Sequence, residues 1–191
     1  MEFEKFDYCF WLGLLNKEEI KNINNICETK IDKSVKDTRT PPLAGELIIK
    51  TSKVDCINWF YLKSSLHEIC ENWMTINRQE FGFNLYGIPD QYYVNYNVYD
   101  SSNNGEYETH VDSTPFAASD TKLTAMVNIS EHSYEGGKFC MFTDGKMRNI
   151  DAFDSPGSSI IFKSWIPHKV TPVTEGIRKT LSVWFIGPRL Q

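Results

Sequence analysis

The sequence has 191 residues, 41% of them hydrophobic and 24% charged, with a formal net charge of -5. This composition is that of a globular protein long enough for one domain with a substantial core. It gives no general attraction to nucleic-acid phosphates, and no apolar run approaches the ~20 residues needed to cross a bilayer.

The first residues, MEFEKFDYCF, carry acidic groups and no basic segment followed by an apolar stretch. They therefore do not resemble a signal peptide, and we expect a cytoplasmic protein. The five cysteines are an odd number and form no C-x-x-C pair, which argues against a disulfide framework or a zinc knuckle. We expect buried or half-buried thiols at Cys9, Cys27, Cys56, Cys70 and Cys140.

The first third of the chain is predicted to be mainly helical. Asn16 is a suitable N-cap for a helix in which isoleucines recur at helical spacing. A second helix is predicted over residues 58–73, because Leu62, Leu66, Ile69 and Trp73 form one apolar stripe. Between them, the polar segment 33–42 indicates a loop and residues 47–49 a short strand.

From Tyr92 onward, Gly, Pro and Asn separate short β-rich runs, a pattern typical of a sandwich or barrel. The predicted strands are 92–98, 122–129, 138–142, 158–162, 168–173 and 180–186. No linker or internal repeat divides the chain. The sequence therefore predicts one domain over residues 1–191, of β-rich α+β class, with helical support over about 1–90 and a β core over about 91–191.

Three residues of this β core have the chemistry of a metal site. Because side chains alternate along a strand, His110 and Asp112 project to the same side. His168 begins a later β run that a rolled barrel could bring opposite them. Two imidazoles and one carboxylate can hold iron(II) and leave positions open for substrate and oxygen. An isolated H-x-D is common by chance, so the hypothesis depends on the combination with His168 and Arg178.

Arg178 follows the last of these residues by ten positions and precedes Thr180, Ser182 and Trp184 on an alternating strand. A guanidinium group offers a fixed fork of donors that matches a carboxylate. If Arg178 is buried, it needs an anionic partner, and an organic acid bound to the metal would provide one. The alternative is an exposed arginine at the start of a strand.

These residues resemble the H-x-D…H…R/K pattern of iron(II)- and 2-oxoglutarate-dependent dioxygenases, in particular the prolyl 4-hydroxylase-like branch with its PKHD-type members. Four further segments agree in order and spacing over residues 92–188. They are GEYETHVD at 105–112, KLTAMVNI at 122–129, YEGGKF at 134–139 and PHKVTPV at 167–173 followed by Gly176 and Arg178. Many prolyl hydroxylases have lysine in place of Arg178, whereas PKHD-type members have arginine.

The resemblance implies a double-stranded β-helix (jelly roll) and a C–H hydroxylation that consumes 2-oxoglutarate and O2 and yields succinate and CO2, with ascorbate a candidate reductant. His110, Asp112 and His168 would bind Fe(II), and Arg178 would pair with the distal carboxylate of 2-oxoglutarate. Further roles are implied for four residues that match family positions. Tyr96 would help to hold that carboxylate, Thr124 would line the cosubstrate site, and Tyr107 and Trp184 would line the substrate side, with Trp184 also near the cosubstrate.

Several functional alternatives remain open from the sequence. A zinc hydrolase could use the same three ligands with an activated water, and a jelly-roll binding module could have no catalytic role. Nucleic-acid demethylation is disfavoured, because Trp184 stands where alkylation-repair dioxygenases have a second arginine. We expect a peptide or a small amino-acid substrate and no nucleic-acid or membrane partner. The sequence does not indicate an oligomeric state.

Overall fold

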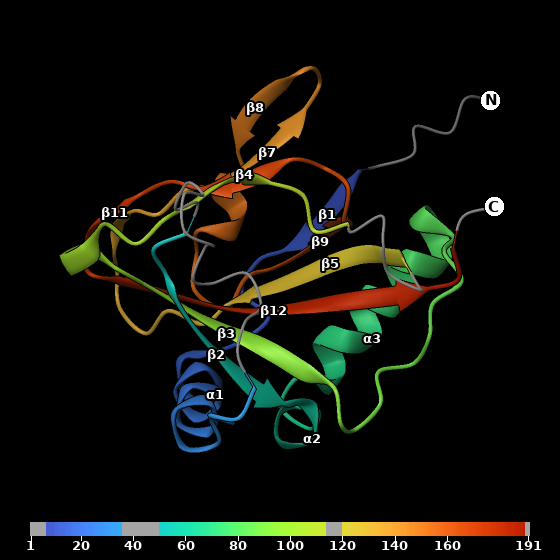
Figure 1. Ribbon diagram of the computed structural model, residues 1–191, viewed down its shortest axis with the longest axis horizontal. Coiled ribbons are helices and arrows are strands. Elements are labelled where there is room, and N and C mark those ends of the chain that lie inside the picture. The colour runs from blue at the N-terminus through green and yellow to red at the C-terminus, as the bar shows by residue number, and fades with distance from the viewer. Residues whose placement is uncertain (1–6, 36–49, 114–119, 190–191) are drawn as a thin grey trace.

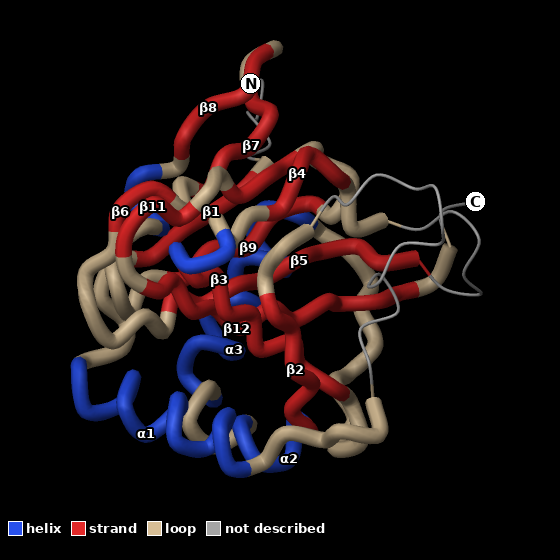
Figure 2. Tube along the Cα trace, turned by 60° about the vertical axis from the view of Figure 1, so that its left-hand side comes forward, coloured by secondary structure: helices blue, strands red, loops and turns tan. Residues whose placement is uncertain are grey.

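The computed structural model describes residues 7–35, 50–113 and 120–189. Its strands form two facing antiparallel sheets, and helices cover the outer face of the larger one (Figure 1). In a second view the helices again lie on one side of the strands, and the β7–β8 hairpin stands at the opposite end (Figure 2). The expected class, a jelly-roll core supported by helices, is confirmed.

The larger sheet has six strands. In spatial order they are β1 (Tyr8–Trp11), β9 (Ser159–Lys163), β5 (Asp120–Asn128), β12 (Ile177–Gly187), β3 (Tyr93–Asp100) and β2 (Lys53–Asn58). The smaller sheet has the order β4 (Tyr107–His110), β10 (His168–Val170), β7 (Phe139–Thr143) and β8 (Lys146–Asn149). A separate pair is formed by β11 (Val173–Glu175) and β6 (Glu135–Gly136).

The helices lie in the first half of the chain. They are α1 (Lys17–Thr29), α2 (Trp59–Leu62), α3 (His67–Ile76) and a π-helical turn, η1 (Asn77–Phe81). Two short 3-10 segments, η2 (Ser101–Asn103) and η3 (Asp151–Phe153), occur later. None of the helices in the described ranges has the length and apolar character to span a membrane.

Helix α1 begins where the sequence predicts. The Asn16 side chain accepts hydrogen bonds from the backbone N–H groups of Glu18 and Glu19, at 2.9 and 3.1 Å. The Glu19 carboxylate in turn accepts from the Asn16 N–H at 2.7 Å. This reciprocal capping box satisfies N–H groups that have no partner within the helix.

The helix predicted over residues 58–73 is interrupted. Asn58 caps only the short α2, and a turn separates it from α3. Ser64 and Ser65 lie in this turn, and serine competes for backbone hydrogen bonds that a helix would use. The apolar stripe is nevertheless buried as expected, at Leu62, Leu66, Ile69 and Trp73.

The first 90 residues are less purely helical than expected. Strands β1 and β2 come from this part of the chain and form the two edges of the six-stranded sheet. Neither strand shows a clear alternation, and β1 has only four residues. The strand expected at 47–49 and most of the loop expected at 33–42 lie outside the described residues.

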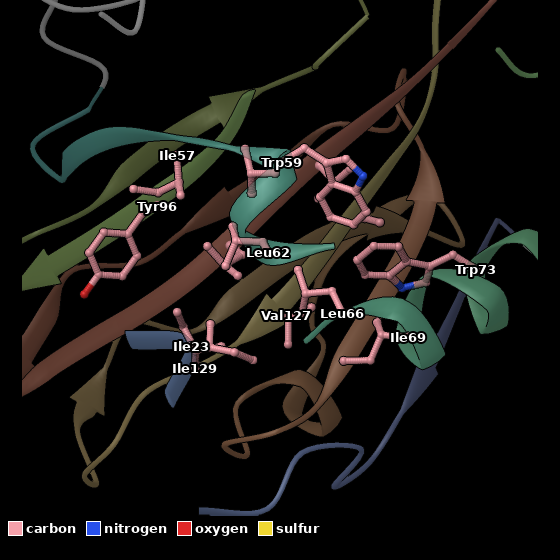
Figure 3. Packing of buried hydrophobic residues seen from close by; sticks show 14 of the residues in the cluster. Ile23, Ile57, Trp59, Leu62, Leu66, Ile69, Trp73, Tyr96, Val127 and Ile129 are labelled. Carbon is pink, nitrogen blue, oxygen red and sulfur yellow. The ribbon is translucent and has the colours of Figure 1, made fainter. Parts of the chain in front are cut away.

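One hydrophobic cluster fills the space between the helices and the larger sheet (Figure 3). Trp73 is its largest fully buried side chain; its indole N–H donates to the Ser159 hydroxyl at 2.8 Å, and its ring meets Phe185 edge-on at 5.9 Å. Burial of such side chains is the main favourable contribution to folding, at about 25 cal/mol per Å² of apolar surface. The helices are therefore part of the core.

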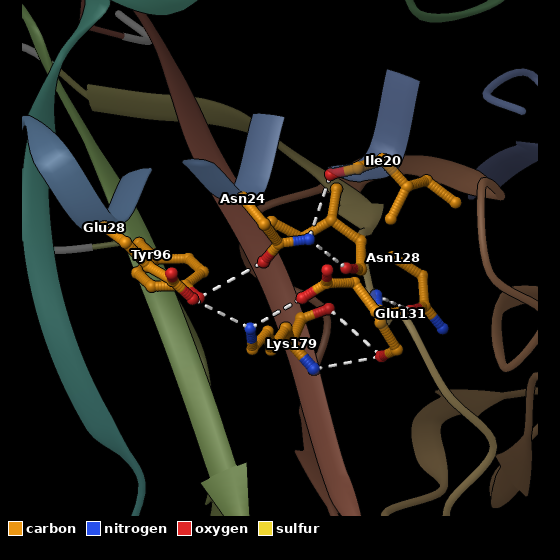
Figure 4. A network of polar contacts seen from close by, with 9 residues as sticks. Ile20, Asn24, Glu28, Tyr96, Asn128, Glu131 and Lys179 are labelled. Carbon is orange, nitrogen blue, oxygen red and sulfur yellow. Dashed lines mark hydrogen bonds and ion pairs between the residues drawn. The ribbon is translucent and has the colours of Figure 1, made fainter. Parts of the chain in front are cut away.

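A polar network crosses the same interface (Figure 4). Asn24 of α1 donates to the backbone carbonyl of Ile129 at 2.7 Å and accepts from the Tyr96 hydroxyl at 3.2 Å. Next to it, the Lys179 ammonium contacts the carboxylates of Glu28 and Glu131 at 3.1 and 3.0 Å. These bonds fix α1 against β3 and β12 because a buried polar group without a partner would be costly.

A second cluster lies between the two sheets and surrounds the barrel interior. Its members come from both sheets and from η3, and the central ones are Tyr99, Tyr107, Met126, Phe139, Phe153, Phe162 and Val170. The cysteines are free, and each is buried or half-buried as expected. Burial raises the pKa of Cys27 to about 12 and that of Cys70 to about 11, so these thiols stay protonated near neutral pH.

We expect stability to fall at alkaline pH through the buried tyrosines. Burial raises the pKa of Tyr92, Tyr96 and Tyr99 to about 12, against about 10 in an unfolded chain. Their contribution is complete below pH 10 and is lost as the pH rises from about 10 through 12. Thermal unfolding should show a midpoint that declines above pH 10. Ionisation of every tyrosine near pH 10 in the folded protein, seen by ultraviolet absorbance, would contradict this expectation.

Candidate metal centre

The strand register of the smaller sheet brings the two candidate histidines together. His110 ends β4 and His168 begins β10, and the two residues are direct antiparallel partners. Their imidazole ring centroids lie 4.2 Å apart. Asp112 follows His110 by two residues, and its carboxylate is almost fully buried beside both rings. Three residues that span 58 positions therefore meet at one end of the barrel interior.

Backbone contacts fix which nitrogen of each ring can bind a metal. His110 Nδ1 lies 2.7 Å from the Glu108 carbonyl oxygen, and His168 Nδ1 lies 2.9 Å from the Ile166 carbonyl oxygen. A carbonyl oxygen can only accept, so each Nδ1 carries the proton and each Nε2 presents its lone pair. Such a hydrogen bond on the far nitrogen is typical of metal-binding histidines.

The distances among the ligand atoms are suitable for a single metal ion. Asp112 Oδ1 lies 3.7 Å from His110 Nε2, and Asp112 Oδ2 lies 3.5 Å from His168 Nε2. All three ligand atoms lie within 4.8 Å of one another. Two neutral imidazoles and a carboxylate therefore form a donor set that fits Fe(II).

Thr124 holds the aspartate. Its hydroxyl donates to Asp112 Oδ2 at 2.8 Å and lies 3.1 Å from the Ser164 hydroxyl. The Asp112 backbone N–H donates to the Ser164 carbonyl at 2.9 Å. The resemblance implied that Thr124 lines the cosubstrate site. The structure places it behind the aspartate instead, outside the cavity lining, where it orients a candidate metal ligand.

The three residues open onto a small cavity of about 30 Å³. Its walls come from both sheets and carry both apolar and polar side chains. The described lining residues are Lys50, Asn95, Asn97, Tyr99, Tyr107, His110, Asp112, Met126, Phe139, His168, Val170, Ser182 and Trp184. The cavity therefore lies directly next to the three candidate metal ligands.

Arg178 is buried at the inner face of β12, with 1% of its surface exposed. Its guanidinium carbon lies 5.2 Å from the centre of the Tyr99 ring and 5.5 Å from that of Phe153. Within the described part of the chain, its Nε and Nη2 have no hydrogen-bond acceptor. The sequence-based alternative of an exposed arginine is therefore wrong. A buried cation with free donors indicates a site for an anion that is supplied from outside the chain.

Tyr96 does not reach this site. It belongs to the cluster between helices and sheet, and its hydroxyl donates to Asn24. Tyr99, three residues later on β3, faces the opposite side, lines the cavity and is the register partner of Arg178. Side chains three apart on a strand point to opposite faces. The position of Tyr96 outside the cavity contradicts its expected role there, whereas Tyr99 lines the cavity beside Arg178.

Tyr107 and Trp184 both line the cavity. The Tyr107 ring stacks on the His110 imidazole, with centroids 3.5 Å apart and planes 16° apart. The backbone N–H and C=O of Trp184 both bond the Tyr92 hydroxyl, at 2.9 and 2.8 Å. Their positions are compatible with the substrate-lining role that the resemblance implies.

Sequence reasoning missed Lys50, Asn95, Asn97 and Tyr99 of the cavity lining. The asparagines and Tyr99 alternate along β3, so this strand's period of two could have identified them as one face. No comparable signal was present for Lys50, which joins the site through an isolated bridge to Tyr107.

Comparisons with known proteins agree with this geometry. Residues 94–186 match the family model described as the 2OG-Fe(II) oxygenase superfamily, whose members use Fe(II), 2-oxoglutarate and O2. A search of curated protein sequences gave no match.

Solved structures of similar fold include three prolyl hydroxylases. The Pseudomonas putida prolyl-4-hydroxylase has a TM-score of 0.69 and 19% identity, covering 96% of this chain and 94% of its own. The collagen prolyl hydroxylase of Paramecium bursaria Chlorella virus-1, solved with 2-oxoglutarate, has a TM-score of 0.66 and 16% identity. The match covers 95% of this chain and 97% of the viral protein. The Trichoplax adhaerens prolyl hydroxylase, solved with a hypoxia-inducible-factor peptide, has a TM-score of 0.66 and 15% identity. The match covers 94% of this chain and 83% of the Trichoplax protein. At these identities the likeness shows a shared fold.

Replacing Thr124 with valine should weaken Fe(II) binding by about 10- to 100-fold, because the Asp112 carboxylate loses the donor that orients it. Metal affinity of the purified protein, measured by equilibrium titration, checks this. Thr143→Val on β7, which is of the same type and lies on the smaller sheet, is the matched control and should bind Fe(II) normally. Equal affinity of the Thr124 variant and the parent would contradict the orienting role.

Proposed function

We propose that this chain, which belongs to the 2OG-Fe(II) oxygenase superfamily, hydroxylates a C–H bond of an amino-acid substrate, free or within a peptide. Each turnover would consume 2-oxoglutarate and O2 and release succinate and CO2. The observation that carries the proposal is the buried Arg178 guanidinium, whose Nε and Nη2 have no hydrogen-bond acceptor among the described residues and which lies in the same barrel interior as the His110–Asp112–His168 cluster.

His110, Asp112 and His168 would hold Fe(II) on one side, and the cavity gives access to the other. When bound, this metal supplies the oxygen activation that the protein's own side chains lack. The two imidazoles are held as neutral ligands by the carbonyls of Glu108 and Ile166. Asp112 is held by Thr124, so the ligand set is arranged before the metal binds.

Arg178 would bind the distal carboxylate of 2-oxoglutarate. Its planar fork can form two parallel hydrogen bonds to one carboxylate, and its low exposure makes that pair strong. Tyr99 lies beside the guanidinium and keeps its proton, because burial raises its pKa to about 12. Its hydroxyl can therefore donate to the same carboxylate. Both residues would orient the cosubstrate with its keto acid end toward the metal ligands.

The remaining walls would position the substrate. Tyr107 and Trp184 provide flat aromatic surfaces, and Met126, Phe139 and Val170 provide apolar ones. These groups can exclude water and hold an aliphatic ring or chain close to the metal ligands. The prolyl substrates named for the similar structures are compatible with this lining.

A zinc hydrolase fits the cavity less well. Hydrolysis through a metal-bound water commonly needs a general base, as in the zinc proteases. Among the described lining residues, Asp112 is the only carboxylate, and it belongs to the metal ligands. A hydrolase would also give no role to the buried guanidinium of Arg178.

The proposed activity is tested by succinate release from the purified protein with Fe(II), ascorbate and 2-oxoglutarate, with free amino acids and proline-containing peptides as substrates. His110→Ala and Asp112→Ala should reduce succinate to background, because each removes a metal ligand. His132→Ala changes an exposed histidine and should keep the parental rate. Turnover that needs Zn(II) and no 2-oxoglutarate would favour the hydrolase.

The two tyrosines of β3 should respond differently to removal of their hydroxyl groups. Tyr99→Phe should raise the KM for 2-oxoglutarate by about tenfold, because a hydrogen bond to a charged group is lost. Tyr96→Phe should leave this KM unchanged. It should lower the unfolding midpoint by about 3 °C, because the bond to Asn24 is lost. Steady-state kinetics and thermal unfolding of both variants check the pair. A higher KM for 2-oxoglutarate in Tyr96→Phe, with no change in Tyr99→Phe, would indicate that Tyr96 binds the cosubstrate.

A further inference from the structure

We propose that β1 is a dimer interface of this chain, at which its free edge pairs antiparallel with β1 of a second copy about a two-fold axis at Cys9. The inference goes beyond the proposed activity, because it concerns the outer edge of the larger sheet and no residue of the cavity. Strand addition of this kind joins two sheets through backbone hydrogen bonds. An interface between two identical edges is closed after two copies.

The backbone of β1 has hydrogen-bonding groups that point away from its neighbour β9. The Asp7 carbonyl accepts from the Lys163 N–H at 3.2 Å, so these two residues are a hydrogen-bonded pair of the antiparallel ladder. Such pairs recur at every second residue, and the next one is formed by Cys9. The N–H and C=O groups of Tyr8 and Phe10 therefore face outward. No described residue forms a hydrogen bond with these four groups.

The edge has room for another strand. A groove of about 440 Å³ follows it, and its described lining is Asp7, Tyr8, Cys9, Phe10, Trp11 and Ile76. Phe10 of the strand and Leu12 just after it are exposed apolar side chains. Charged residues and proline commonly protect an edge strand from pairing, and the sequence YCFW of β1 contains neither. The strand is therefore open to association.

The other edges of the two larger sheets differ from β1. Isolated bridges from Ile31 and Lys50 adjoin β2 and β4, respectively. The edge strand β8 carries the charged residues Lys146 and Arg148. Among the edges of these two sheets, β1 is therefore the one that has neither a bridge nor a charged side chain within the described residues.

The side chains of β1 are complementary to those of a second β1. The antiparallel register that uses all four outward groups pairs Tyr8 of each copy with Phe10 of the other. These two rings already stack within one strand, with centroids 6.4 Å apart and planes 23° apart. Pairing extends this row of rings across the axis, and cross-strand aromatic pairs stabilise a sheet. Asp7 falls opposite Trp11 of the second copy, so no carboxylate meets another.

The same register places the two Cys9 residues opposite each other. They form a non-hydrogen-bonded pair, in which the Cα atoms are about 4.5 Å apart. A disulfide can span this separation. Cys9 is a free, half-buried thiol. A link between the two copies at Cys9 therefore reports both the pairing and its register.

The first measurement is sedimentation velocity of the reduced full chain over a range of concentrations. A pairing of two short strands makes a small interface, so we expect a dimer with a dissociation constant of roughly 1–100 μM. Phe10→Lys brings a charge to the edge and should weaken dimerisation by at least about tenfold. Phe142→Lys on β7 is the matched control, because Phe142 is 45% exposed and Phe10 is 44% exposed. It should dimerise as the parent does.

The second measurement is oxidation of the dimer with diamide, followed by electrophoresis without reductant. Two Cys9 thiols should form one disulfide between the copies, while diamide takes up the two electrons and two protons that they lose. Cys9→Ser should abolish the covalent dimer. Cys70→Ser changes the other half-buried cysteine and should retain it.

Three outcomes would overturn the assignment. They are a parent chain that stays monomeric up to about 200 μM, a dimer that Phe10→Lys leaves unchanged, and a covalent dimer that forms equally in Cys9→Ser. The first result uses the unmodified chain and so remains decisive if Phe10→Lys does not fold. Failure of the oxygenase proposal is separate: the parent would form no succinate, while its dimerisation through β1 persisted.

Discussion

The register between β4 and β10 is the constraint on which the site depends. Pairing His110 with His168 places two imidazoles side by side. The carbonyls of Glu108 and Ile166 then fix the proton on the outer nitrogen of each ring. A shift of this pairing by one residue would turn one imidazole to the opposite face of the sheet. Backbone hydrogen bonds thus set the orientation of both candidate metal-binding imidazoles.

Side chains on the larger sheet alternate between the barrel interior and the side covered by the helices. On β12, Arg178 faces the barrel interior, whereas its neighbour Lys179 faces α1 and contacts two carboxylates there. Both cations are shielded, but of the two only Lys179 forms ion pairs with carboxylates of the described residues. The sheet therefore keeps a satisfied ion pair on its structural face and a cation available for a ligand on its functional face.

Much of the site could be predicted because its signals are local. His110 and Asp112 lie at the end of one strand. The side chains that alternate after Arg178 include Ser182 and Trp184, and both of these line the cavity from β12. Tyr96 was wrongly placed because similarity in a motif does not fix which face of β3 a residue occupies. Lys50 could not be found because its position depends on a long-range bridge. For the same reason β1 and β2 were missed: their pairing partners are distant in the chain.

One feature outside the cavity limits how this sequence can vary. Gly137 has a φ of +57°, and a Cβ added there would meet Val173 Cγ2 at 2.8 Å and Arg178 Cδ at 3.1 Å. At its neighbour Gly136, which has a φ of +70°, an added Cβ would lie 2.2 Å from the Pro172 carbonyl oxygen. Any side chain at Gly137 would therefore press on the aliphatic part of Arg178, and any side chain at Gly136 would press on the backbone of Pro172. Amino-acid substitution at these two glycines should be as restricted as at the candidate metal-binding residues, although neither glycine has a reactive side chain.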